Sequence, residues 1–258
     1  ERFAPVCGAI HASGTYVSLR PVAIGAFSFR ATACRTGETK NHSGGRVDWI
    51  DLTHPLYTGM PVIPGDPSPE VVDTQTLQQD GCSVQEIRFA NHVGTHVDAP
   101  LHFIPHAMSV DRIPLRKLVG SAAVLDFSHL EAGSRIRWRE LESALANAGN
   151  PDKVLIRTGW ERHFGSQQYF GDFPALDSEA ARGLAELGID LLGVDAPSPS
   201  TLEDPGQRIH KALLAAEVVI VENLCSLHAL GPWAEVFILP LALRGASGAP
   251  CRAVGRPL

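Results

Sequence analysis

Three histidines and one carboxylate lie within the eleven residues that run from His92 to His102 and read H-V-G-T-H-V-D-A-P-L-H. Imidazole nitrogens and carboxylate oxygens are ligands that Zn²⁺ and Mn²⁺ accept. A hydrolytic metal site needs about three protein ligands and one open position for water. His92, His96 and Asp98 could supply such a triad, with His102 left over.

A structural role is the alternative for each of these side chains, because a single histidine motif is weak evidence for a ligand. Gly94 and Pro100 exclude a regular helix, so the helical HExxH arrangement of metalloproteases does not apply. In an extended segment, Asp98 lies on the same side as His96, and Gly94 permits close approach of the backbone. We therefore expect the cluster at a strand end and in the loop that follows.

Composition limits the other classes of function. The chain has 258 residues, 44% of them hydrophobic, which can furnish a sizeable core. Its net charge of −6 argues against a nucleic-acid partner, and no run approaches the roughly 20 apolar residues of a membrane span. The five cysteines are odd in number, widely spaced and without a CxxC pair, so no disulfide framework or thiolate zinc site is indicated. We expect a reducing, cytoplasmic setting.

Hydrophobic patterning predicts an α/β fold. Residues 1–46 lack periodicity and are expected to form a peripheral extension, and residues 47–258 the ordered domain. The proline- and glycine-rich residues 59–67 predict an ordered loop. Helical spacing occurs at 138–145, 177–187 (with Asp177 or Ser178 as the cap) and 208–214. Strands are predicted at 47–52, 84–90, 120–127, 153–160, 189–195, 218–224 and 236–243, with 245–252 as a glycine- and proline-rich tail. The strand at 84–90 would deliver the chain into the histidine cluster.

Three more polar residues, on predicted elements or at their ends, could contribute to a site. Asp195 ends the strand at 189–195, where a loop-capping role is at least as plausible as a functional one. Glu222 follows an aliphatic strand, where a carboxylate is costly unless it is paired or bound to a metal. From the residues alone, an exposed Glu222 in a turn and a His210 on a helix surface remain an open alternative.

Motifs along most of the chain resemble the cyclase-type metal-dependent hydrolases, a family that includes bacterial kynurenine formamidase and isatin hydrolase. The resemblance covers about residues 47–252, and its motifs occur in the same order. They are D-L-T-H-P-L at 51–56, M-P at 60–61, P-G-D at 64–66, the cluster at 92–102, G-V-D at 193–195, His210, E-N-L at 222–224, L-P-L at 239–241 and P-C-R-A-V at 250–254.

The resemblance implies a division of labour in the site. His92, His96 and Asp98 resemble ligands of a first ion, with Asp98 able to bridge to a second. His210 and Glu222 resemble the remaining ligands, and His102 resembles a catalytic acid/base outside the coordination sphere. One or two divalent ions, Zn²⁺ or Mn²⁺, are implied. The fold implied is a single compact α/β domain with a β-barrel-like sheet core, in a homodimer or homotetramer.

The implied reaction is hydrolysis of a C–N amide bond by metal-activated water. The substrate would be a small molecule, either an arylformamide such as N-formylkynurenine or a cyclic amide such as isatin. Ile63 stands where kynurenine formamidases carry a tryptophan, so the resemblance favours the reaction class over one substrate. A metal-dependent lyase or dehydratase and a non-catalytic metal-binding protein on the same scaffold are the alternatives.

Overall fold

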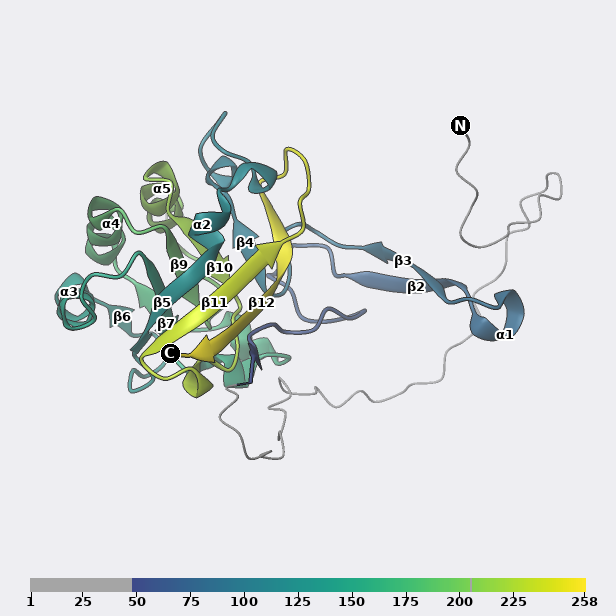
Figure 1. Cartoon of the computed structure of the whole chain (residues 1–258), viewed down its shortest axis with the longest axis horizontal. Coiled ribbons are helices and arrows are strands. Elements are labelled where there is room, and N and C mark those ends of the chain that lie inside the picture. Colours follow the sequence, from purple (N-terminus) through teal and green to yellow (C-terminus); the bar gives the residue numbers. More distant parts are fainter. Residues whose placement is uncertain (1–47, 205) are drawn as a thin grey trace.

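A ring of seven strands forms the centre of the computed structural model, which describes residues 48–204 and 206–258. The ring strands are β4 (His96–Asp98), β5 (Val119–Asp126), β7 (Lys153–Arg157), β9 (Leu191–Val194), β10 (Val219–Glu222), β11 (Trp233–Pro240) and β12 (Gly248–Pro257). Their order is β12-β11-β5-β7-β9-β10-β4, and β4 pairs with β12 to close the barrel (Figure 1). β5, β7, β9 and β10 run parallel, and the other pairings are antiparallel. The predicted α/β fold with a barrel-like core is confirmed.

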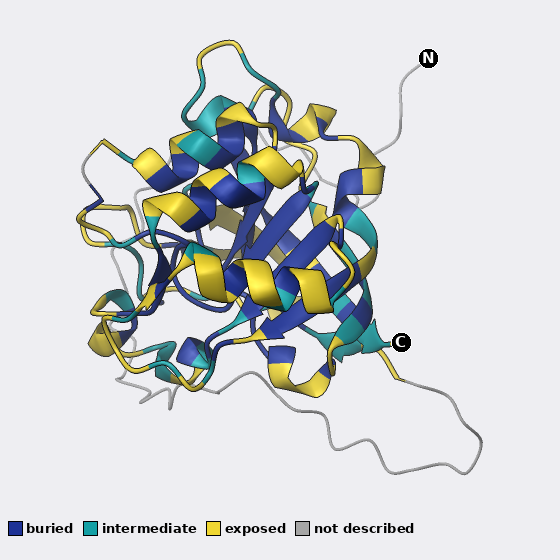
Figure 2. Cartoon of the chain, turned by 90° about the vertical axis from the view of Figure 1, so that its left-hand side faces the viewer, coloured by how far each residue is buried: buried dark blue, intermediate teal, exposed yellow. Residues whose placement is uncertain are grey.

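Three helices cover one side of the barrel: α3 (Trp138–Asn147), α4 (Ser178–Leu187) and α5 (Arg208–Ala215). In each helix the buried residues lie on the side that faces the strands and the exposed residues on the outer side (Figure 2). The Asp177 carboxylate caps α4 by accepting from the Ala180 N–H at 2.7 Å, and α4 ends at Gly188, which has φ +69°. The predicted helices and the predicted cap are confirmed.

Two hydrophobic cores result from strand alternation. One lies inside the barrel, and the other lies between the barrel and the three helices. In β10, Val219 and Val221 belong to the inner core, whereas Ile220 belongs to the core beneath the helices. Glu222, two residues after Ile220, therefore lies on the outer face of the barrel near α5.

Smaller elements complete the described chain. The short strands are β1 (Ile50–Asp51), β2 (Glu70–Gln75), β3 (Val84–Arg88), β6 (Arg135–Ile136) and β8 (Ala175–Leu176), and the short α-helices are α1 (Leu77–Asp80) and α2 (Leu115–Leu118). The 3₁₀ helices are η1 (Pro100–His102), η2 (Val110–Arg112), η3 (Trp160–His163), η4 (Gln167–Phe170) and η5 (Leu227–Ala229). Residues 59–67 lie between β1 and β2 and form a loop, as predicted.

The strand predicted at 84–90 exists as β3, but its expected connection to the cluster is wrong. Within the described part of the chain, β3 pairs only with β2, and the two form an arm that projects from the barrel with α1 at its tip (Figure 1). Every residue of β3 is exposed. Two of the candidate ligands lie instead on their own barrel strand, β4, because alternation predicts a strand without specifying its partner.

The tail predicted after residue 245 is also wrong, because Gly248–Pro257 forms the ten-residue strand β12. β12 pairs with β11 on one side and with β4 and β1 on the other. Glycine and proline weaken a strand locally, but pairing on both sides overrides that preference here.

The cysteine and membrane expectations fare differently. Cys251 is a free thiol, whereas Cys225 is disulfide-bonded, which the sequence did not indicate when it argued against a disulfide framework. Spacing alone carries little information about a single pair.

Among residues 48–204 and 206–258, no helix has the length and apolar character needed to cross a membrane. The extension predicted at 1–46 lies outside the described residues.

Candidate metal centre

The register between β4 and β10 assembles the centre of the site. Val97 belongs to the core inside the barrel, so its neighbours His96 and Asp98 face outward. Antiparallel pairing places Glu222 of β10 directly opposite His96. α5 packs against β10 and brings His210 to the same place.

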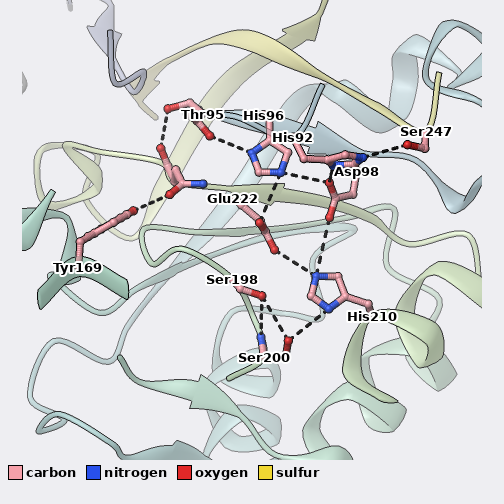
Figure 3. Close-up of polar contacts among 12 residues, drawn as sticks. His92, Thr95, His96, Asp98, Tyr169, Ser198, Ser200, His210, Glu222 and Ser247 are labelled. Carbon is pink, nitrogen blue, oxygen red and sulfur yellow. Dashed lines mark hydrogen bonds and ion pairs between the residues drawn. The ribbon is translucent and has the colours of Figure 1, made fainter. Parts of the chain in front are cut away.

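Short distances join these side chains (Figure 3). His96 Nε2 lies 3.2 Å from Asp98 Oδ1 and 3.4 Å from Glu222 Oε2. His210 Nε2 lies 3.1 Å from Glu222 Oε1 and 3.8 Å from Asp98 Oδ2. His92, in the loop before β4, places Nδ1 2.7 Å from Asp98 Oδ1.

The five side chains form two groups that share Asp98, and within each group the potential ligand atoms lie within 4.8 Å of one another. The groups are His92, His96 and Asp98, and Asp98, His210 and Glu222. Glu222 is 4% exposed and His210 is 6% exposed, so the alternative that placed them at the surface is wrong. The structure thus brings together all five residues expected to be ligands.

Each of the three imidazoles also has an oxygen partner on its other nitrogen. His96 Nδ1 lies 2.8 Å from the Gly94 carbonyl, His92 Nε2 lies 2.9 Å from Ser247 Oγ, and His210 Nδ1 lies 3.2 Å from Ser200 Oγ. Metal-binding histidines are typically held in this way, because a second partner fixes the ring and its tautomer. The arrangement suits Zn²⁺ or Mn²⁺, which accept nitrogen and oxygen ligands.

Electrostatics concentrate negative charge at the centre. Burial opposes ionisation of Asp98, but hydrogen bonds to His92 and His96 hold its pKa well below the usual value. Burial also opposes protonation of His96, but Asp98 and Glu222 outweigh it and raise the pKa of His96 to about 9. A hydrogen bond to Glu222 likewise raises the pKa of His210 against the effect of burial. Buried carboxylates must be paired, and a divalent cation could replace the protons that pair them.

His102 lies beside the five residues and belongs to neither group. It ends η1, and its ring stacks on that of His92 with centroids 3.8 Å apart. Burial lowers the pKa of His102 to about 4, although the charge of Asp98 opposes the shift. The imidazole is therefore neutral near pH 7 and can accept a proton.

A cavity of about 470 Å³ opens onto the site. His96, Asp98, His102 and Glu222 contribute to its wall. Apolar side chains, among them Ile63, Phe103 and Leu202, line it together with polar ones such as Asn91 and Gln207. Its volume and mixed lining suit a small organic molecule.

Asp195 has a structural place. It is fully buried, and it accepts hydrogen bonds from the backbone N–H groups of Thr158 and Gly159 at 2.9 and 2.7 Å. Burial raises the pKa of Asp195 to about 6. These contacts join the ends of β7 and β9, as the loop-capping interpretation predicted.

The sequence carried no local signal for the hydroxyl partners of the histidines. Ser247 is 155 positions from His92, and a serine near glycines is typical of any loop. Ser200 lies ten positions before His210, in a loop noted only for following a strand. Their contacts arise from the closure of the barrel and the packing of α5.

Comparison with known proteins gives consistent matches. Residues 50–201 match the family model described as putative cyclase. A kynurenine formamidase from Bacillus cereus is 34% identical over 212 residues, which cover 82% of this chain and 98% of that protein.

Solved structures agree with the fold. A potential metal-dependent hydrolase with cyclase activity is 28% identical, with a TM-score of 0.64 over 81% of this chain and 98% of the other. An isatin hydrolase bound to the product analogue thioisatinate gives a TM-score of 0.75 at 21% identity, over 82% of this chain and 92% of the other. At that identity the second likeness is one of fold.

Proposed function

The chain belongs to the cyclase family, and from this premise we propose the reaction, the ligands and the substrate class of its site. The protein is a metal-dependent amide hydrolase, which cleaves a C–N bond by the addition of water. The observation that supports this most is the convergence of five nitrogen- and oxygen-bearing side chains at the wall of a cavity.

We propose that the first group, His92, His96 and Asp98, holds one divalent ion and that Asp98, His210 and Glu222 can hold a second. Zn²⁺ and Mn²⁺ both suit these ligands. A bound ion would polarise the substrate carbonyl and lower the pKa of water.

His102 is the proposed acid/base. Its neutral ring can take a proton from the water that adds to the carbonyl carbon. When the C–N bond breaks, the protonated ring can give that proton to the leaving nitrogen. Such proton transfer typically contributes about 10²- to 10⁴-fold to the rate.

The cavity favours a small aromatic amide. Phe103 lies beside His102, with ring centroids 4.2 Å apart, and offers an apolar surface next to the acid/base. Ile63 and Leu202 extend that surface. We propose an arylformamide such as N-formylkynurenine, the class named by the Bacillus relatives, or a cyclic amide such as isatin.

Substrate assays test this function. The metal-stripped protein, reloaded with Zn²⁺ or Mn²⁺, is expected to hydrolyse N-formylkynurenine, isatin or a simple aryl amide, and the stripped protein is not. Product analysis distinguishes hydrolysis from elimination by a lyase or dehydratase. Binding of metal without turnover of any of these amides would favour a non-catalytic metal-binding protein.

We also propose a homodimer or homotetramer. The support is the arm formed by β2 and β3, which projects from the barrel (Figure 1). Its apolar side chains Val72 and Ile87 are exposed. The cytoplasmic location stays a prediction from the sequence, and the disulfide at Cys225 is a reason to test it by cell fractionation.

A further inference from the structure

Two contacts hold His92 at the start of β12, one from the loop before the strand and one from its first residue, Gly248. Ser247 Oγ lies 2.9 Å from His92 Nε2, on the side of the ring away from Asp98 (Figure 3). The next residue, Gly248, packs so closely on the same ring that a Cβ atom there would lie 2.5 Å from His92 Cε1. One contact is polar and the other steric, and both act on one imidazole.

The backbone of this loop is fixed by the barrel. Gly248 stands opposite Asp98 in the pairing of β12 with β4. The Ala99 N–H donates to the Ser247 carbonyl at 2.9 Å. The Ser247 hydroxyl therefore has a defined position relative to the strand that carries His96 and Asp98.

A second contact orients the hydroxyl. Asn91 Nδ2 donates to Ser247 Oγ at 3.0 Å and so occupies one of its two lone pairs. The other lone pair can accept a hydrogen from His92 Nε2. With a cation in place of the hydrogen between Nδ1 and Asp98 Oδ1, which lie 2.7 Å apart, the Nδ1 lone pair would then be free for the ion. A hydroxyl can equally donate to Nε2, so Ser247 suits both neutral tautomers of His92. The Gly94 carbonyl beside His96, in contrast, can only accept.

We propose that Ser247 and Gly248 are positioning residues, which orient the His92 imidazole so that Nδ1 is its metal-binding atom and Nε2 carries the hydrogen. The inference rests on the proposed metal site and adds the atom through which His92 binds. Neither residue lines the cavity described above, so they act on His92 and not on the substrate. Removal of such a partner typically weakens metal binding about 10- to 100-fold.

Zinc affinity of four proteins tests the proposal. The dissociation constant for Zn²⁺ is measured by chelator competition for the wild type, Ser247→Ala, Ser247→Thr and the control Ser143→Ala, which removes the hydroxyl of an exposed serine on α3. Thermal unfolding without metal verifies that each variant folds. We expect about 10- to 100-fold weaker binding for Ser247→Ala and changes within about threefold for the other two variants. Equal affinity for Ser247→Ala and wild type, or equally weak binding by Ser247→Thr, would overturn the role of the hydroxyl.

Nitrogen NMR of the histidine rings supplies a second readout. With Zn²⁺ bound, His92 is expected to carry its hydrogen on Nε2, and a hydrogen on Nδ1 would overturn the assignment. Gly248→Ala is expected to weaken zinc binding as well, since its Cβ would lie 2.5 Å from His92 Cε1 and 2.6 Å from the Val97 carbonyl of β4, so the ring or the strand beside it must shift. If the wild-type protein itself binds no Zn²⁺, the proposed metal site fails, which is a result distinct from equal binding by the variants.

Discussion

His92 and His102 stack ring on ring, yet only His92 points a nitrogen at a buried carboxylate. His92 contacts Asp98, whereas His102 faces the cavity with a neutral ring and an apolar neighbour, Phe103. Loss of the His92 ring should therefore affect metal binding, whereas loss of the His102 ring should affect proton transfer.

Alanine at position 102 is expected to separate binding from turnover. His102→Ala should keep its bound metal and lose about 10²- to 10⁴-fold in kcat, because the acid/base is removed while all five proposed ligands remain. His96→Ala should lose both metal and turnover, because His96 lies between Asp98 and Glu222. Metal content by mass spectrometry and kcat are measured for both, with the exposed His129→Ala as control. A fully active His102→Ala enzyme would contradict the assignment of His102 as the acid/base.

His54 predicts a pH effect on stability. It is 3% exposed, its ring stacks on Phe164 at 3.6 Å, and its Nε2 has no hydrogen-bond partner among the described residues. Burial lowers the pKa of His54 to about 4, against the opposing charge of Asp51. Because that pKa lies below the unfolded value of 6.5, the unfolded chain binds more protons in this window, and stability falls as the pH drops from about 6.5 to about 4.

His54→Phe keeps the ring stack and removes the titrating nitrogens. Between about pH 7 and about pH 5, the variant should lose about 2 kcal/mol less unfolding free energy than wild type. Urea unfolding at both pH values measures this, and His129→Phe makes the same change at an exposed position. Parallel pH profiles for wild type and His54→Phe would refute the effect.

Residue types alone predicted a metal site at 92–102, because imidazole and carboxylate groups are the ligands that Zn²⁺ and Mn²⁺ accept, and the structure brings His92, His96 and Asp98 together. They could not predict the roles of Ser200 and Ser247, because serine is common in loops and only the fold places these two hydroxyls beside His210 and His92. His210 and Glu222 were ambiguous from their sequence context, and only the packing of α5 on β10 places them inside.

At the scale of elements, the register of β4 against β10 matters most for the site. It sets Glu222 opposite His96, and a shift of β4 by one residue would turn His96 and Asp98 into the barrel core, away from Glu222. The boundaries of α3 and α4 matter less for the site, because these helices cover the barrel and carry no proposed ligand.

The cap of α4 is therefore a test of stability alone. Asp177→Ala should lower the unfolding free energy by about 1 kcal/mol, because the Ala180 N–H loses its acceptor. Asp177→Ser retains a capping oxygen and should stay near wild type. Urea unfolding gives both values, and zinc affinity should be the same in all three proteins. An alanine variant as stable as the serine variant would contradict the capping role.

Continuous apolar runs predicted the buried strands, which are covered on both faces, and helical spacing predicted the three long helices, which bury one face. Periodicity could not place β3 in an arm or recognise β12 as a strand. Alternation did not show that β3 pairs with the neighbouring β2 outside the barrel. Local glycine and proline obscured β12, whose pairing with β4 closes the barrel between segments distant in sequence.

At the scale of the whole molecule, the arm is the least self-sufficient part. A two-stranded hairpin is marginally stable alone, and this one exposes 56% of Val72 and 57% of Ile87. These residues lie on opposite faces, since Val71 and not Val72 pairs with Ile87. A second copy of the chain could cover both faces in a symmetric dimer.

Charged substitutions in the arm test this assembly. Light scattering is expected to show an oligomer for wild type and a shift toward monomer for Val72→Lys combined with Ile87→Lys. Leu187→Lys makes the same type of change on α4, where Leu187 is 47% exposed, and should leave the assembly intact. A monomeric wild type, or an unchanged double variant, would contradict the arm's role.

Anomalous diffraction from crystals grown with Zn²⁺ or Mn²⁺ locates the ion directly. The strongest peak at the absorption edge is expected among His92, His96, Asp98, His210 and Glu222, about 2.0–2.3 Å from their nearest nitrogen and oxygen atoms. A second peak on the other side of Asp98 would indicate two ions. A fully loaded protein whose strongest peak lies away from these five side chains would contradict the proposed metal centre.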